Sequence, residues 1–193
     1  MTNLQPYLDG SRTGKVVGIT FDDGYLNNLE HALPALRRHG FSSTCYAVSA
    51  LAGQTNLWDA DIGLAQTPLM NAAQMRQWVE GGQEIGSHTR HHVDLTQTPD
   101  EQSRTEMASG KSELEAVLGT VVSHFCYPYG RFEPKHVTMV KAQGFDTSTT
   151  TKRGRCFAGM DWFELPRVPV LRSTSLLLFW LKFATGYEDR RRK

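Results

Sequence analysis

The sequence has few cysteines, almost no net charge and no long apolar run. Its 193 residues include only Cys45, Cys126 and Cys156, whose number and spacing fit neither a disulfide framework nor a zinc knuckle. Lys and Arg number 21 against 20 Asp and Glu, which excludes a broad basic face for nucleic acid. The longest apolar run, Leu176 to Leu181, is far shorter than the roughly 20 residues of a transmembrane helix. These absences predict a reduced globular protein without a transmembrane segment.

A signal peptide is also missing, because Met1 to Pro6 contains no basic stretch followed by an apolar one. We therefore expect a cytoplasmic location for the chain as it stands, and a cell-envelope location if it is the trimmed form of a longer protein. The sequence shows no internal repeat and no low-complexity segment. Its length and its 39% hydrophobic residues predict one globular domain over residues 1–193.

Segments typical of strands and of helices alternate along the chain. Short β-branched or apolar runs predict strands over 15–21, 43–50, 83–87, 121–127, 147–151 and 165–170. Helical spacing or capping residues predict helices over 29–40, 71–79, 98–119 and 134–144, the third opened by a capping box at Thr98. Such alternation indicates a parallel sheet, but a regular eight-fold barrel needs about 250 residues. We therefore expect an α/β fold, a distorted (β/α) barrel with fewer than eight regular strands.

Three of the predicted strands end in residues that can carry chemistry. The first ends in Asp22-Asp23, the third in Ser87-His88, and the fourth in Pro128-Tyr129-Gly130. Ligands of parallel α/β proteins bind at the carboxyl ends of the strands, so these three segments should converge. The convergence predicts an active site at that end of the barrel.

His88 and His92 are spaced as two metal ligands on one side of a helical turn would be. Adjacent carboxylates at a strand end point in different directions, so one of Asp22 and Asp23 can bind a cation while the other faces the reacting atom. The alternatives are a pair of surface histidines and an ordinary Asp-Asp-Gly turn. Two histidines, one aspartate and an open position form a known type of hydrolytic metal site.

Three motifs together resemble the polysaccharide deacetylases, carbohydrate esterase family four, whose chitooligosaccharide-deacetylase-like domain this chain is similar to. They are Thr20-Phe21-Asp22-Asp23-Gly24, the segment from Ser87 to Leu95, and Phe125-Cys126-Tyr127-Pro128-Tyr129-Gly130. The resemblance extends from about Val16 to Val170. It implies a distorted barrel and a metal-dependent hydrolase of C–N bonds other than peptide bonds, acting on an N-acetylated carbohydrate.

The resemblance also implies roles for individual residues. Asp22 matches the catalytic base, and Asp23, His88 and His92 match the metal ligands. Tyr129 matches the residue whose backbone N–H helps to bind the oxyanion and the substrate. The implied cofactor is one divalent metal ion, with zinc as first choice and cobalt, manganese or nickel as alternatives.

The sequence departs from the family pattern at two positions. Many members have an arginine where this chain has Cys126, and we expect Arg167, on a late strand, to replace it as a catalytic residue beside Asp22. The alternative for Arg167 is a surface charge between prolines. The late Leu-x-His motif, whose histidine is the usual general acid, is missing, since no histidine follows His136. His124 can point inward, but a structural role for it is equally open.

Aromatic and apolar segments add two further expectations. Trp162 is our candidate for stacking on a sugar, in preference to Trp58 and to Trp78, which we expect in the core. The apolar segment from Leu176 to Phe183 is expected to form a helix that closes the barrel, with Arg190 to Lys193 as a solvated tail. The alternative is peripheral contact of this segment with an anionic membrane.

The leading functional hypothesis is a metal-dependent hydrolase that removes N-acetyl groups from an amino sugar in a poly- or oligosaccharide. A carbohydrate-binding relic with weak or no catalysis is the second hypothesis, since the usual acid is missing. A metal hydrolase of another amide or ester is the third. The sugar polymer and the oligomeric state stay open.

Overall fold

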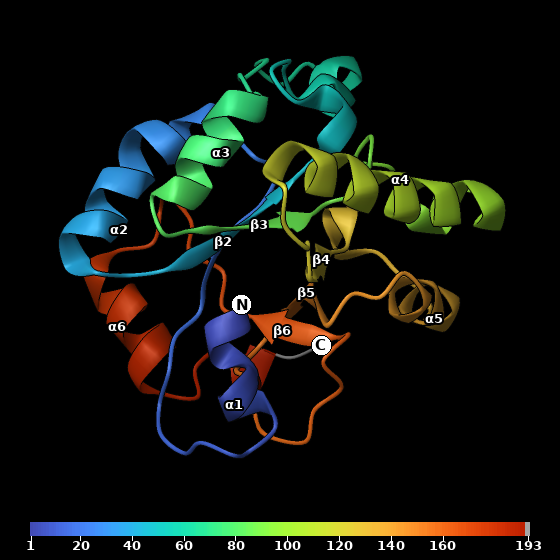
Figure 1. Ribbon diagram of the computed structural model, residues 1–193. Coiled ribbons are helices and arrows are strands. Elements are labelled where there is room, and N and C mark those ends of the chain that lie inside the picture. Colours follow the sequence, from blue (N-terminus) through green and yellow to red (C-terminus); the bar gives the residue numbers. More distant parts are fainter. Residues whose placement is uncertain (192–193) are drawn as a thin grey trace.

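The computed structural model describes residues 1–191 and contains one curled sheet of six parallel strands (Figure 1). The strands lie in the sheet in the order of the sequence, so that β1 and β6 form its two edges. They are β1 (Ile19–Phe21), β2 (Ser43–Ala47), β3 (Glu84–Ser87), β4 (His124–Cys126), β5 (Thr147–Arg153) and β6 (Leu165–Arg167). The fold is therefore an α/β distorted barrel, as the sequence predicts.

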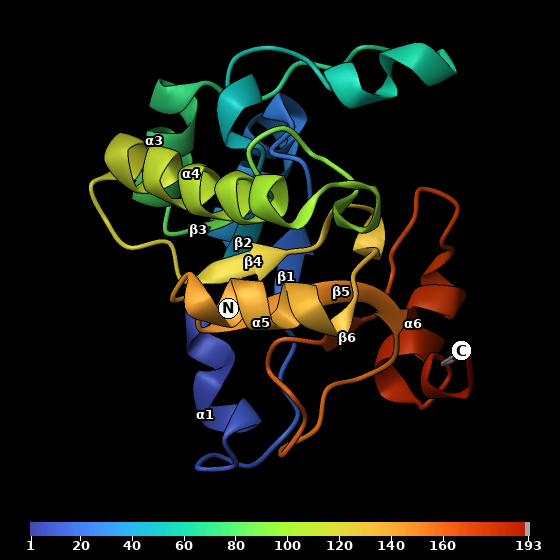
Figure 2. The same ribbon diagram turned by 90° about the vertical axis from the view of Figure 1, so that its right-hand side faces the viewer.

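Helices surround the outer side of the curled sheet (Figures 1 and 2). The α-helices are α1 (Gln5–Leu8), α2 (Leu33–His39), α3 (Ala72–Glu80), α4 (Asp100–Leu118), α5 (Pro134–Ala142) and α6 (Leu176–Ala184). A π-helical turn, η2 (Asn28–Ala32), leads into α2. Short 3₁₀ segments are η1 (Thr2–Leu4), η3 (Ser49–Leu51), η4 (Leu57–Ile62), η5 (Leu95–Gln97), η6 (Pro128–Gly130) and η7 (Asp189–Arg191).

Local sequence explains where most of the helices begin and end. A capping box of Asn71 and Gln74 opens α3, and left-handed glycines at positions 40 and 119 end α2 and α4. The expected capping box at Thr98 is wrong. The Thr98 hydroxyl donates to the Asp94 carbonyl instead, and α4 begins after Pro99 with no side-chain cap.

Several strands are shorter than predicted, because apolar runs continue into exposed segments. Val17 and Val121 lie before β1 and β4 and are exposed. Since β1 is an edge strand, its residues are only half-buried. The apolar runs therefore include exposed residues that precede the strands as well as the strands themselves.

The core lies between the sheet and its helices, and the N-terminal segment fills the amino end of the barrel. Trp78 is completely buried, as expected, and its Nε1 donates to the Glu84 carbonyl. The N-terminal ammonium of Met1 forms an ion pair with Glu84 and donates to the Thr44 hydroxyl. The opposite, carboxyl end is thus the open end of the barrel.

The C-terminal segment differs from its expected role. A helix that closed the barrel would bury its apolar side chains, but Leu176, Leu177 and Trp180 of α6 are exposed. No helix in residues 1–191 is long and apolar enough to cross a membrane. Arg192 and Lys193, half of the expected solvated tail, lie outside the described residues.

Candidate active site

The register of the sheet aligns the carboxyl ends of its first four strands. Phe21 pairs with Cys45, Ala47 with Ser87, and Ser87 with Phe125. Through Cys45, Phe21 is level with Ile85, so Asp22 and His88, which follow β1 and β3, lie within two residues of the same level. The convergence expected from the sequence is present.

Asp23, His88 and His92 bring three potential metal-binding atoms together. The Nε2 atoms of both histidines lie 3.4 Å from the same carboxylate oxygen, Oδ1 of Asp23. Atoms bound at about 2.1 Å around a tetrahedral metal are about 3.4 Å apart, whereas good N–H···O bonds are nearer 2.9 Å. These three residues, which can hold a metal ion, fit one better than they fit direct hydrogen bonding.

The backbone explains how two histidines four residues apart can face one aspartate. The segment is a bend and not the helical turn considered above, with Thr89 and His92 in the left-handed region at φ 63° and 60°. The amide of His92 donates to the Thr89 hydroxyl, which stabilises this bend. Nδ1 of His88 lies 2.7 Å from the Cys126 carbonyl, so it carries the proton and leaves Nε2 free as a ligand.

Electrostatics prepares Asp23 and His92 for a cation. Burial by itself lowers the pKa of His88, but its interactions with Cys126 and Asp23 raise it, so a metal ion has to displace a proton there. Burial by itself raises the pKa of Asp23, but its interactions with the nearby His88 and His92 rings outweigh the effect of burial, and the pKa falls well below its usual range. Burial lowers the pKa of His92. At neutral pH Asp23 is therefore ionised and His92 is neutral, the states in which each binds a metal.

A buried carboxylate from α4 supports the histidine segment from behind. Glu106 accepts hydrogen bonds from the backbone amides of Arg90 and His91, and its Oε1 lies 2.7 Å from His91 Nδ1. Gly110, one turn further along α4, permits this approach, because a Cβ there would lie 3.0 Å from the Thr89 backbone. His91, which neighbours a candidate ligand, therefore also helps to hold this segment.

Asp22 leaves the sheet beside Asp23 but faces a different partner. Because Asp23 adopts a left-handed conformation (φ 72°), the two carboxylates diverge through the turn and not through strand alternation. Arg167 binds Asp22 with both ends of its guanidinium, at 2.6 and 2.7 Å. Burial raises the pKa of Asp22, but the hydrogen bonds and charge of Arg167 lower it below its ordinary value. The contact expected between these two residues is present.

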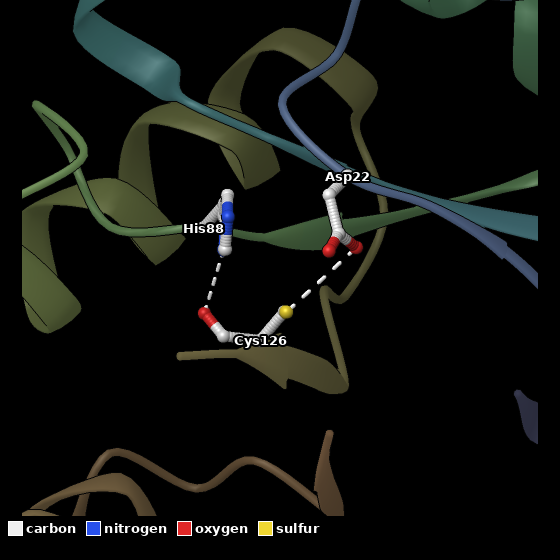
Figure 3. A group of neighbouring side chains, drawn as sticks. All are labelled: Asp22, His88 and Cys126. Carbon is white, nitrogen blue, oxygen red and sulfur yellow. Dashed lines mark hydrogen bonds between the residues drawn. The ribbon is translucent and has the colours of Figure 1, made fainter. Parts of the chain in front are cut away.

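Cys126 points at the same carboxylate. Its Sγ lies 3.8 Å from Asp22 Oδ1 (Figure 3) and 3.4 Å from Arg167 Nη2. Figure 3 also shows His88 and Asp22 turned toward Cys126 from two other strand ends. The short cysteine side chain leaves room for the guanidinium that reaches in from β6.

A cavity of about 260 Å³ opens over these groups. Tyr129 stands at its edge in a left-handed conformation (φ 58°), with its ring against His92 at 4.5 Å. Gly130 lets this turn approach β5, because a Cβ there would collide with Thr151. A volume near the lower end of the range of ligand pockets suits a group no larger than about one sugar unit. The lining residues are Asp22, Asp23, Trp58, Asp59, His88, His92, Tyr127, Tyr129, Gly130 and Thr151.

Comparison with known proteins identifies this arrangement. The family model described as "Polysaccharide deacetylase" matches residues 9–148, which is more than half of the chain. The chain belongs to the polysaccharide deacetylase family. A curated relative, the polysaccharide deacetylase homologue YxkH of Bacillus subtilis (strain 168), is 26% identical over 162 residues. That alignment covers 84% of this chain and 54% of YxkH. This chain therefore spans about half the length of its relative.

Solved structures show the same polysaccharide deacetylase fold. The Streptococcus pyogenes deacetylase PplD, in complex with acetate, matches with a TM-score of 0.81 and 23% identity over 94% of this chain and 77% of PplD. IcaB from Ammonifex degensii matches with a TM-score of 0.78 and 24% identity over 92% of this chain and 78% of IcaB. A more distant match, BA3943 of Bacillus anthracis, is a pseudoenzyme of the same family, at a TM-score of 0.56 and 21% identity over 70% of this chain and 43% of BA3943.

In this member of the polysaccharide deacetylase family, the tryptophan in the cavity is not the one that the sequence analysis preferred. Trp58 lines the cavity and stacks on His92, with ring centroids 4.2 Å apart. Among the described residues that line the cavity, Trp162 does not occur. Asp59, the neighbour of Trp58, was not considered from the sequence at all. Neither residue belongs to a sequence motif. Only the folded position of η4 places them at the cavity.

His124 lies away from the cavity, at the amino end of the barrel. Its Nδ1 lies 3.0 Å from the Thr147 hydroxyl and its Nε2 lies 3.1 Å from the Thr2 hydroxyl. Both ring nitrogens are thus engaged, as in the structural role that the sequence left open. Among the described residues that line the cavity, only His88 and His92 are histidines.

Proposed function

We propose that this polysaccharide deacetylase family member is a metal-dependent hydrolase that removes the N-acetyl group from an amino sugar in a poly- or oligosaccharide. The observation that carries the proposal is one site with two distinct carboxylates. Asp23 faces two histidines at a spacing suited to a metal, and Asp22 is held apart from them by Arg167. A mere binding site has no need for the second, oriented carboxylate.

In this proposal Asp23, His88 and His92 hold one divalent metal ion, with zinc as first choice and cobalt, manganese or nickel as alternatives. A metal ion held there would supply polarisation of the acetyl carbonyl and activation of water. Asp22 accepts the proton from the attacking water, because Arg167 keeps it ionised and oriented. The backbone N–H of Tyr129 donates to the oxyanion that forms from the carbonyl.

The leaving nitrogen then needs a proton. Because the described residues that line the cavity include no histidine besides the two proposed ligands, Asp22 returns the proton that it accepted. Trp58 and Tyr129 provide aromatic surfaces for the sugar at the cavity. The acetate in the PplD structure is the kind of product that this reaction releases, although that ligand belongs to PplD.

The test is release of acetate from N-acetylated oligosaccharides by the full chain, measured before and after metal removal and restoration. We expect Asp22→Asn to lose at least about 10²–10⁴-fold in kcat while it retains its metal, measured by mass spectrometry of the folded protein. His124→Ala, whose side chain lies away from the cavity, is the matched control. Equal acetate release by wild type and Asp22→Asn would refute the assignment of the base.

The carbohydrate-binding relic is the second candidate, favoured by the absence of a histidine that could act as the acid. It predicts tight binding of the oligosaccharide, measured by calorimetry, without any release of acetate. Hydrolysis of small acyl amides or esters in preference to sugars would instead support the third hypothesis.

A further inference from the structure

Helix α6 exposes its apolar side and buries its charged residue. Leu176, Leu177 and Trp180 are 88%, 70% and 59% exposed, and their spacing places them on one face of the helix. Lys182, on another face, is only 5% exposed. A surface helix in contact with water has the opposite arrangement.

Contacts within the protein fix this orientation. Nζ of Lys182 forms an ion pair of 2.8 Å with the buried carboxylate of Glu188 and donates to the Pro169 carbonyl. Glu188 also pairs with Arg153, at the end of β5. Rotation of α6 to bury its leucines would break this ion pair and leave Glu188 without its nearer cation, which is unfavourable. The exposed apolar face is therefore a built feature of the fold.

The surroundings of the apolar face are basic. Val170 and Leu171, in the turn before α6, are also exposed and extend the apolar surface. Arg172 in the same turn and Arg190 after the helix are exposed. The acidic residues of this region are engaged, Glu188 with Lys182 and Asp189 with Arg155. The uncompensated charge beside the leucines is thus positive.

We propose that α6 and the preceding turn dock on the surface of a lipid bilayer that contains anionic lipids. A helix of nine residues is about 14 Å long, so it can lie in the interface but cannot span it. Leucine and tryptophan side chains enter the boundary between headgroups and acyl chains, while arginines bind the anionic headgroups.

This docking would bring the candidate active site to the membrane. Glu188 binds Arg153 at the end of β5, and Thr151 of the same strand lines the cavity. In Figure 2, α6 lies at the side of the molecule toward which β5 runs. The carbohydrate reached by the cavity would then be one held near a membrane surface.

The experiment is co-sedimentation of the full chain with vesicles of phosphatidylcholine alone or mixed equally with phosphatidylglycerol. We expect binding to the mixed vesicles, and at least about tenfold weaker partitioning for Leu176→Ser/Leu177→Ser/Trp180→Ser, since three large apolar side chains no longer enter the bilayer. The matched control is Val17→Ser/Val121→Ser, which removes side chains 56% and 70% exposed at the amino ends of β1 and β4. Circular dichroism checks that each variant is folded.

The double variant Arg172→Gln/Arg190→Gln tests the contribution of charge. It should weaken binding to mixed vesicles and leave any residual binding to neutral vesicles unchanged. The proposal is overturned if wild type does not bind mixed vesicles, or if the triple variant binds as well as wild type. It is also overturned if light scattering shows a dimer that the triple variant converts to a monomer, because a second copy would then cover α6. None of these measurements depends on catalysis, so Asp22→Asn should bind vesicles like wild type.

Discussion

Arg167 and Asp22 join the two edges of the sheet. Arg167 ends β6 and Asp22 follows β1, and no strand pairing links β1 with β6 in the described chain. The guanidinium crosses this seam, binds both oxygens of Asp22 at 2.6 and 2.7 Å, and also donates to the Thr20 hydroxyl and the Thr150 carbonyl. One side chain thus closes the seam of the barrel and fixes the proposed base.

This arrangement predicts that Arg167 acts through its forked geometry. Arg167→Lys keeps the charge but loses the paired contacts, so we expect kcat to fall by about 10–10²-fold, with KM little changed. The Asp22 pKa should rise as well, because its hydrogen bonds and part of the opposing charge are lost. Steady-state kinetics of acetate release, with and without sugar saturation, measures the change.

A swap of the two side chains provides the control. Cys126→Arg/Arg167→Cys returns the arginine to the strand where many family members carry it, within reach of Asp22. We expect this double variant to regain at least about tenfold in kcat over Arg167→Cys alone. No recovery, in a variant with native circular dichroism, would show that the position on β6 matters beyond its contact with Asp22.

Glu106 should control metal affinity without binding the metal. It orients the segment between His88 and His92 through two backbone amides. We expect Glu106→Gln to weaken zinc binding by about 10–100-fold, measured by competition with a chelating dye. Glu113→Gln is the comparison, because Glu113 holds the same segment only through the half-exposed Arg90 side chain. Equal losses for the two variants would contradict the special role of Glu106.

Trp58 should contribute more to sugar binding than Trp162. Its indole lines the cavity and stacks on His92, so its removal takes away an aromatic surface beside the proposed reaction centre. We expect Trp58→Ala to raise KM by about three- to tenfold, and Trp162→Ala to raise it less. The reverse order would restore Trp162 as the stacking residue of the first sugar. Metal content must be measured in parallel, because Trp58 also covers a proposed ligand.

His124 should make folding stability depend on pH. Burial and the nearby N-terminal ammonium lower its pKa from 6.5 to about 4. Between these values the unfolded chain binds more protons than the folded one, so the free energy of unfolding decreases as the pH falls. The loss approaches about 3 kcal/mol at pH 4. Urea unfolding at pH 7.5 and 4.5 should show a smaller difference for His124→Gln, and an unchanged difference would argue against this assignment.

The candidate metal ligands could be found from the sequence because they lie within motifs. Asp23 and His88 lie within two residues of strand ends, His92 follows His88 in the same motif, and parallel strands bring their carboxyl ends to one edge. The fold class followed from the alternation of strands and helices for the same reason. Backbone detail did not follow, since the left-handed residues at Asp23, Thr89 and His92 depend on contacts such as those of Glu106.

By itself, the sequence determined the alternation of strands and helices that makes a parallel barrel, and the C-terminal ends of α2 and α4. It also determined which residues meet at the carboxyl ends of β1, β3 and β4. Each of these depends on local backbone preference or on strand order, which neighbouring residues encode. Only the tertiary structure decided that Trp58 lines the cavity and that α6 turns its leucines outward. Both outcomes depend on partners far away in the sequence, His92 for Trp58 and Arg153 for the Glu188 that holds Lys182. Apolar spacing shows which side chains share a face of a helix, but only the packed neighbours determine where that face points.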